Sequence, residues 1–182
     1  MNVRVIAGEY GGRKLSAPNT SRTHPMGERI RASLFNIIND EIENAVVLDA
    51  FAGTGVIGFE ALSRGAQAVT FIEKDRVAAK IIAENREVLG IASQSASIIP
   101  ATVSAWDQKY PEAQFDIIFC DPPYHDVQFS TVSKLFSHLK TNGLMVLSHP
   151  GRSETPTGTG VVVVDNRSYG DAVLTFYRKV QE

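Results

Sequence analysis

Residues 45–66 read AVVLDAFAGTGVIGFEALSRGA, and this stretch decides the fold. The apolar run over residues 45–50 predicts a buried strand, and a helix is predicted from Gly58 to Ser63. The turn between them, which starts at Gly53, matches the pattern G-x-G-x-x-G. Glycines at such a turn let the backbone approach a ligand closely, and the start of the helix presents free N–H groups. The stretch predicts a nucleotide-type binding loop; the alternative is a tight turn that binds nothing.

Beyond this stretch, β-rich runs alternate with helical runs as far as residue 148, which predicts a mainly parallel sheet covered by helices. The further predicted strands are 68–73, 97–99, 115–120 and 144–148, and the further predicted helices are 76–89 and 129–139. Two more β-rich runs, 160–165 and 172–178, are separated only by NRSYGD, which leaves no room for a helix. They predict an antiparallel hairpin at the edge of the sheet.

The start of the chain predicts a small unit of its own. Val3–Ala7 and Arg13–Leu15 can pair as two strands around a glycine-containing turn, and a helix is predicted over residues 28–39. We therefore expect a β-hairpin extension at residues 1–24 and the main α/β domain at residues 25–182.

The composition excludes several classes of protein. The chain has 182 residues, of which 43% are hydrophobic and 21% charged, as in an ordinary globular domain. The single cysteine, Cys120, can form no internal disulfide, and the four histidines lack metal-ligand spacing, so we expect no metal. No apolar run approaches the roughly 20 residues of a membrane span, and the start lacks the apolar stretch of a signal peptide. We expect a cytoplasmic monomer without a membrane partner.

Charge is distributed unevenly along the chain. The net charge is −2 and the pI about 6.1, which argues against a protein that coats nucleic acid with its whole surface. Residues 1–31 nevertheless carry a net charge of +4, and the remainder carries −6. We expect the basic residues of this first part to contact RNA phosphates, with strong salt dependence; the alternative is an ordinary solvated surface. They are Arg4, Arg13, Lys14, Arg22, Arg29 and Arg31.

Asp49 distinguishes between possible ligands of the glycine loop. It ends the first predicted strand, four residues before Gly53, and Glu73 ends the next strand, where it can bond both ribose hydroxyls. A carboxylate beside the pyrophosphate of a dinucleotide would be repelled, whereas the ammonium and sulfonium groups of S-adenosylmethionine would be attracted. At about 4 Å and an effective dielectric constant of about 20, the interaction is on the order of 4 kcal/mol, with opposite signs in the two cases. Asp49 favours S-adenosylmethionine; the alternative is a carboxylate that caps the following turn.

Asp121-Pro122-Pro123-Tyr124 follows the strand predicted at 115–120, at the edge where open α/β sheets bind ligands. The prolines remove N–H donors and leave carbonyl acceptors, which suit an exocyclic amine. Hydrogen bonds from a base amine to Asp121 and the Pro122 carbonyl would turn the nitrogen lone pair toward the methyl group, and Asp121 would stabilise the developing positive charge. The Tyr124 ring can stack on a flipped or single-stranded base. We expect Asp121, Pro122 and Tyr124 to be the catalytic residues.

These motifs resemble a known family. DAFAGTGVIGFEALSRGA at 49–66, FIEKD at 71–75 and FDIIFCDPPY at 115–124 resemble class I S-adenosylmethionine-dependent methyltransferases that modify amino groups. The sequence of these motifs most resembles the RsmD family, which are bacterial methyltransferases of a guanine N2 in small-subunit (16S) ribosomal RNA. RVIAGEYGGRKL, ERIRASLFNII and YGDAVLTFY also resemble that family, so the similarity spans nearly the whole chain. Thr23-His24-Pro25-Met26 departs from the family's T-R-P-T.

The resemblance implies a Rossmann-like, seven-stranded, mainly parallel sheet with an antiparallel last strand. It implies methyl transfer from S-adenosylmethionine to rRNA, as naked RNA or in a small-subunit assembly particle. The alternatives are a DNA adenine-N6 or protein-glutamine methyltransferase with the same pocket, and a dinucleotide-binding oxidoreductase. Many class I enzymes place an acidic residue beside the adenine amine, where this chain offers Thr102 or a backbone carbonyl. The predicted cofactor residues are Asp49, Phe51, Gly53, Gly55, Glu73, Lys74 and Thr102.

Overall fold

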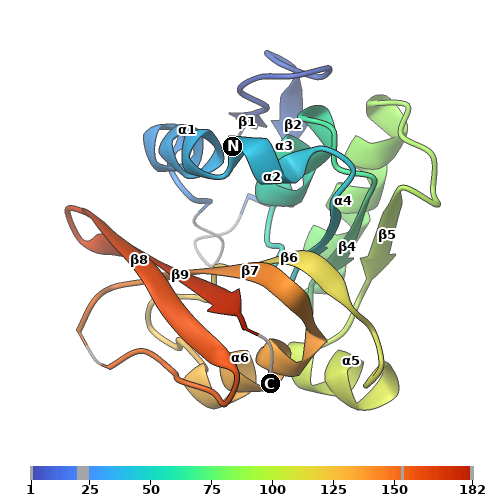
Figure 1. Cartoon of the computed structure of the whole chain (residues 1–182). Coiled ribbons are helices and arrows are strands. Elements are labelled where there is room, and N and C mark those ends of the chain that lie inside the picture. Colours follow the sequence, from blue (N-terminus) through green and yellow to red (C-terminus); the bar gives the residue numbers. More distant parts are fainter. Residues whose placement is uncertain (1, 20–24, 153, 181–182) are drawn as a thin grey trace.

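The computed structural model describes residues 2–19, 25–152 and 154–180. A seven-stranded sheet has the order β5-β4-β3-β6-β7-β9-β8 and forms the centre of the molecule (Figure 1). Its strands are β3 (Val46–Asp49), β4 (Ala68–Ile72), β5 (Ala96–Ile99), β6 (Phe115–Cys120), β7 (Leu139–His149), β8 (Val161–Tyr169) and β9 (Ala172–Lys179). β3, β4, β5, β6 and β7 are paired in parallel, and β9 is antiparallel to both of its neighbours, β7 and β8. The predicted sheet, with its antiparallel last strand, is confirmed.

The helices cover both faces of the sheet, as parallel strands require. They are α1 (Glu28–Ile37), α2 (Asn39–Ile42), α3 (Val56–Ser63), α4 (Arg76–Val88), α5 (Val103–Lys109), α6 (Phe129–Lys134) and the 3-10 helix η1 (Leu135–His138). Side chains alternate between the faces. Val47 and Ile117 belong to the core cluster that contains residues of α1, α3 and α4, and Leu48 and Ile118 belong to the cluster with Trp106 of α5.

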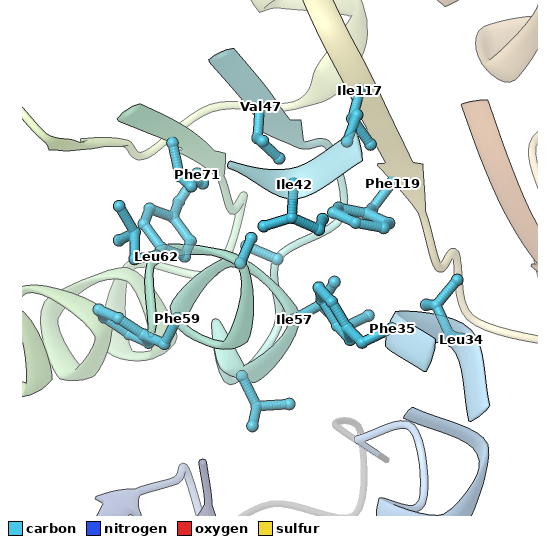
Figure 2. Packing of buried hydrophobic residues seen from close by; sticks show 14 of the residues in the cluster. Leu34, Phe35, Ile42, Val47, Ile57, Phe59, Leu62, Phe71, Ile117 and Phe119 are labelled. Carbon is cyan, nitrogen blue, oxygen red and sulfur yellow. The ribbon is translucent and has the colours of Figure 1, made fainter. Parts of the chain in front are cut away.

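Helix α3 is buried along its whole length and fixes the glycine loop against the sheet. Figure 2 shows Ile57, Phe59 and Leu62 of this helix within the apolar cluster. The rings of Phe59 and Phe71 lie 4.9 Å apart between centroids, so α3 packs directly on β4. The loop that precedes α3 therefore ends at a helix that is packed firmly on the sheet, at the carboxyl edge of the strands.

The N-terminal strands pair with each other as expected, but the first ends at Arg4 and not at the predicted Ala7, and the segment after it is attached to α3. β1 (Asn2–Arg4) and β2 (Lys14–Ser16) are antiparallel, with Val3 opposite Leu15. The backbone N–H groups of Ile6 and Ala7 donate to the buried carboxylate of Glu60, at 2.8 and 3.1 Å. The extension thus shares buried contacts with the main body, while the expected boundary at residues 24 and 25 adjoins undescribed residues.

Several predicted boundaries were wrong. The helix expected at 28–39 is interrupted at Ile38, and the helix expected at 129–139 changes to 3-10 geometry at Leu135. The connection NRSYGD is mostly strand, because Asn166 to Tyr169 pair with β9 and only Gly170 and Asp171 turn. β7 begins at 139, and the turn expected near Asn142 is a bulge within it (φ +65°). Helix α5 was not predicted. Within the described residues, no helix is long and apolar enough to cross a membrane.

Candidate active site

Three carboxylates meet at the carboxyl edge of the sheet. Asp49 ends β3, Glu73 directly follows β4 and Asp121 directly follows β6, and these strands are parallel neighbours. The charges of Asp121 and Glu73 both raise the pKa of Asp49. Acidic groups gathered in this way produce a negative potential that attracts a cationic ligand. The structure brings together the residues that the sequence singled out in three separate motifs.

Asp49 combines a structural contact with an unused acceptor. Its side chain is 1% exposed, and its Oδ2 accepts a hydrogen bond from the N–H of Gly58, 3.1 Å away. No described residue donates to the other oxygen, Oδ1, although it is fully buried. Burial, followed by the neighbouring carboxylates, raises the pKa of Asp49 to about 7. A buried acceptor without a hydrogen-bond partner costs folding free energy, so this oxygen is a candidate for contact with a ligand.

The glycines of the loop are required by conformation and by packing. Gly53 and Gly55 have φ of +56° and +77°, in the left-handed region that favours glycine. A Cβ on Gly58 would lie 2.2 Å from a ring carbon of Phe71 on β4, so only glycine allows α3 to approach the strand this closely. The three glycines thus place the start of α3 beside the carboxyl ends of β3 and β4.

Glu73 holds the glycine loop in place. Its Oε2 accepts from the N–H of Gly53 at 2.7 Å, and its Oε1 accepts from the N–H of Asp75 at 2.9 Å. Asp75 in turn caps α4 by accepting from the N–H groups of Val77 and Ala78. Burial raises the pKa of Glu73, against the effect of the two backbone hydrogen bonds. Each carboxylate oxygen has a second lone pair, which leaves acceptor positions for hydroxyl groups.

The Asp121–Tyr124 loop lies directly beside this cluster. Asp121 is partly exposed at a narrow crevice whose other walls include Met26, Leu34 and Ser148. Burial raises the pKa of Asp121 to about 7. Among the described residues, none donates a hydrogen bond to the carbonyl oxygen of Pro122. Tyr124 is 41% exposed, and its hydroxyl lies 2.6 Å from the Oγ of Ser148.

The other predicted cofactor residues border the same edge. Phe51 is partly buried in the turn between Asp49 and the glycines, and Lys74 is exposed immediately after Glu73. Thr102 follows β5 and caps α5, where its Oγ1 accepts from the N–H of Ala105 at 3.1 Å. This cap explains why α5 begins where it does.

The basic residues of the first part divide into different groups. Lys14 and Arg29 are exposed, and Arg13 is exposed with one guanidinium nitrogen donating to the carbonyl of Val88. Arg4 is exposed but is bound through its Nε to Glu28, 3.0 Å from Oε1. Arg22 lies outside the described residues.

Arg31 corrects the prediction of an RNA contact. It is 2% exposed, and its guanidinium donates to the carbonyls of Met26 and Arg4 at 3.0 and 2.7 Å. Its Nε lies 3.6 Å from Oε1 of the buried Glu60. Arg31 therefore joins α1, β1 and α3 inside the protein and offers no surface charge to a phosphate.

Sequence reasoning missed two polar residues that organise this region. Ser148 is buried at the end of β7 beside the Asp121–Tyr124 loop, and Glu60 binds two backbone N–H groups of the N-terminal segment. Glu60 is a single polar residue within an apolar run, and Ser148 directly follows the apolar run of residues 144–147; the sequence offers no other signal for them. Among the residues that the structure describes, no group of three or more His, Cys, Asp or Glu could hold a metal ion.

Comparison with known proteins agrees with this geometry. The family described as conserved hypothetical protein 95 matches residues 3–178, nearly the whole chain. "Ribosomal RNA small subunit methyltransferase D" of Haemophilus influenzae is 40% identical over 124 residues, 68% of this chain and 64% of that protein. The chain belongs to the RsmD-type methyltransferase family. The family resemblance of the motifs is thereby confirmed.

Two further known proteins match this chain over nearly its whole length and nearly all of their own. "Putative rRNA methyltransferase YlbH" of Bacillus subtilis is 30% identical over 182 residues, 97% of this chain and 99% of that protein. The solved structure named "Putative methyltransferase yhhF from Escherichia coli" has a TM-score of 0.88 and 28% identity, and the match covers all of both chains. By contrast, the match to the Haemophilus influenzae protein spans less than two thirds of that relative. The RsmD-type fold thus extends through the whole chain.

Proposed function

We propose that this RsmD-type chain transfers a methyl group from S-adenosylmethionine to the exocyclic N2 amine of a guanine in small-subunit ribosomal RNA. One observation carries the proposal: the buried Asp49, one oxygen of which has no partner among the described residues, lies at the same sheet edge as the Asp121 and Pro122 acceptors. The first site suits a cation, and the second suits an amine. A methyl donor with a sulfonium and a base with an amino group need this combination.

The residues present fit S-adenosylmethionine. Asp49 Oδ1 is available to an ammonium group, and the second lone pairs of Glu73 are available to ribose hydroxyls. Phe51 and Lys74 border this position, and Thr102 stands at the neighbouring strand end. A dinucleotide fits less well, because its pyrophosphate would face three carboxylates. When bound, S-adenosylmethionine supplies an electrophilic methyl group on its sulfonium.

The chain's own residues prepare the base for the transfer. The amine of a guanine is a poor nucleophile because its lone pair is delocalised into the ring. In the proposed complex its two N–H groups donate to the Asp121 carboxylate and to the Pro122 carbonyl, which reduces the conjugation of the lone pair with the ring and directs it toward the methyl group. Asp121 stabilises the positive charge that develops on the nitrogen, and the proton leaves to solvent. The exposed ring of Tyr124 stacks on the base.

Ribosomal RNA is proposed as the substrate because the family members named above include rRNA methyltransferases. Residues 1–24 would then serve as an RNA-contacting extension and residues 25–182 as the catalytic domain. The exposed Arg13, Lys14 and Arg29 are available for phosphate contacts. We propose a monomer that acts in the cytoplasm on RNA or on a partly assembled small subunit.

The test measures transfer of tritiated methyl from S-adenosylmethionine to small-subunit RNA, small-subunit particles and duplex DNA. The product is hydrolysed to nucleosides and separated. We expect N2-methylguanosine from one of the ribosomal substrates, and loss of transfer in a folded Asp121→Ala variant. N6-methyladenosine from duplex DNA would assign the pocket to a DNA methyltransferase, and label in protein glutamine would assign it to a protein methyltransferase. Tight binding of NAD, with none of S-adenosylhomocysteine, would overturn the proposed cofactor.

A further inference from the structure

Ser148 lies near the end of β7, beside the Asp121–Tyr124 loop that follows the neighbouring strand β6. In the parallel pairing of β6 with β7, Cys120 is opposite Leu147, so Asp121 and Ser148 follow at neighbouring positions of the carboxyl edge. Ser148 is 3% exposed and lines the same crevice as Asp121. Its Oγ is 2.6 Å from the hydroxyl of Tyr124. A buried hydroxyl thus touches one proposed catalytic residue and adjoins another.

We propose that Ser148 is a positioning residue that joins Tyr124 to Asp121 through hydrogen bonds and so orients both groups for the target base. The inference rests on the proposed function, because it concerns how the same pocket receives an amino group. It assigns a role to a residue of β7, outside the glycine loop and the DPPY motif.

The chemistry of the three groups fixes the direction of the hydrogen bonds. An ionised carboxylate can only accept, and a serine hydroxyl has one hydrogen to donate. When Asp121 is ionised, Ser148 donates to the carboxylate and must therefore accept from Tyr124. The tyrosine hydroxyl is then held at the end of β7, while the residue as a whole stays partly exposed to solvent. Protonation of Asp121 would remove this constraint on direction, because a protonated carboxyl can donate as well as accept.

The same contact affects the charge of Asp121. Burial raises the pKa of Asp121 to about 7, and the neighbouring Ser148 hydroxyl lowers it. The other titratable groups around Asp121 do not lower its pKa in this way. Asp49 on β3 is itself acidic, and burial raises the pKa values of the Cys120 thiol and the Tyr124 phenol, so that neither group carries a positive charge. The remaining crevice walls are apolar, contributed by Met26, Leu34, Ile57, Phe119 and Val146. Loss of the hydroxyl would leave Asp121 protonated at a higher pH.

The experiment compares Ser148→Ala, Tyr124→Phe and the double variant in the methyl-transfer assay over a range of pH. Each single variant is expected to raise KM for the RNA about three- to tenfold, as for a lost hydrogen bond. In the Tyr124→Phe background, Ser148→Ala should raise KM by a smaller factor than in the wild-type chain, because only its contact with Asp121 remains to be lost. Ser148→Ala should also move the acid limb of kcat/KM upward by about one pH unit. A purely structural role of Ser148 would not move this limb.

The matched control is Ser33→Ala, which breaks another serine–tyrosine contact of 2.6 Å, to Tyr169, away from Asp121. It should leave the acid limb unchanged. The inference would be overturned if the KM of the double variant rose by the product of the two single-variant factors. It would also be overturned if the acid limb of kcat/KM did not move in a folded Ser148→Ala variant. Because Tyr124 is exposed, Tyr124→Phe tests the contact even where Ser148→Ala fails to fold.

A second readout separates this inference from the proposed function. The pKa of a carbon-13-labelled Asp121 carboxyl is measured by NMR in the protein without substrate, and it should rise in Ser148→Ala. If the wild-type chain methylates no ribosomal RNA while this pKa still rises, the proposed function fails and the hydrogen-bond link stands. If the chain methylates rRNA and the pKa does not rise, the link fails and the function stands.

Discussion

Replacement of Asp49 by Asn separates binding of the cofactor from stability of the fold. The variant keeps an oxygen that can accept from Gly58 but loses the charge proposed to face the ammonium group. A hydrogen bond between charged groups contributes about 1.5–3 kcal/mol, so Kd for S-adenosylmethionine should rise about 10- to 150-fold. Isothermal titration calorimetry at pH 8 measures this change.

The same substitution should not destabilise the protein at pH 8. The raised pKa of Asp49, from its ordinary 3.8 to about 7, means that ionising this carboxyl costs the folded state about 4 kcal/mol at pH 8. The amide nitrogen of Asn would lack a partner, which costs about 1–3 kcal/mol. We therefore expect the free energy of unfolding to rise by about 1–3 kcal/mol at pH 8.

The sign follows from proton binding. Between pH 3.8 and 7 the folded state holds a proton on Asp49 that the unfolded state has released, so wild-type stability increases as the pH falls through this window. The advantage of Asn should shrink by about 2 kcal/mol between pH 8 and pH 5.5, measured by urea unfolding without cofactor. Asp171→Asn, in the exposed hairpin turn, is the control with the same change in net charge. Wild-type affinity in Asp49→Asn, or an advantage independent of pH, would refute the reasoning.

Further predictions concern the loop, the core and the basic surface. Glu73→Ala should lower the affinity for S-adenosylmethionine by at least about tenfold in calorimetry, because it removes the proposed ribose acceptors and the hydrogen bond that holds the glycine loop. Unchanged affinity would contradict this. Gly58→Ala should lower the free energy of unfolding by about 1–3 kcal/mol in urea, since its Cβ would overlap a β4 phenylalanine, while Gly27→Ala, in open space, should change it little. Reversing both Arg13 and Lys14 to Glu should reduce the slope of log K for RNA against log salt by about 1–2; an unchanged slope would exclude this surface.

The sheet could be predicted because each strand carries its own signal. Apolar runs of four to six residues bounded by glycine, proline or polar residues gave β3, β4 and β6 nearly at their observed limits. The short hydrogen-bonded ends of elements could not be placed in this way. Thr102 begins α5 by capping the N–H of Ala105, and this local contact outweighs the weak apolar pattern of residues 103–109.

The burial of Arg31 could not be predicted from its charge, but the helical periodicity of the sequence around it indicates it. Counting charges placed it with the exposed basic residues, yet it is three and four residues before the buried Leu34 and Phe35. This spacing places it on the inner face of α1. Its partners, chiefly the carbonyls of Met26 and Arg4, come from separate parts of the fold, so their meeting could not be predicted from one sequence.

The residues proposed to hold the cofactor and the base could be singled out because they lie in contiguous motifs at strand ends. Asp49, Glu73 and Asp121 meet because parallel strands deliver their carboxyl ends to one edge. Ser148 reaches the same edge from β7, but no motif surrounds it, and its significance depends on a contact with Tyr124 that only the folded chain makes.

The central claim is tested most directly by nucleoside mass spectrometry of small-subunit rRNA from cells that lack this protein. The account predicts that one N2-methylguanosine disappears, that the wild-type chain restores it, and that a folded Asp121→Ala chain does not. Unchanged N2-methylguanosine in the deletion strain, or full restoration by Asp121→Ala, would contradict the account.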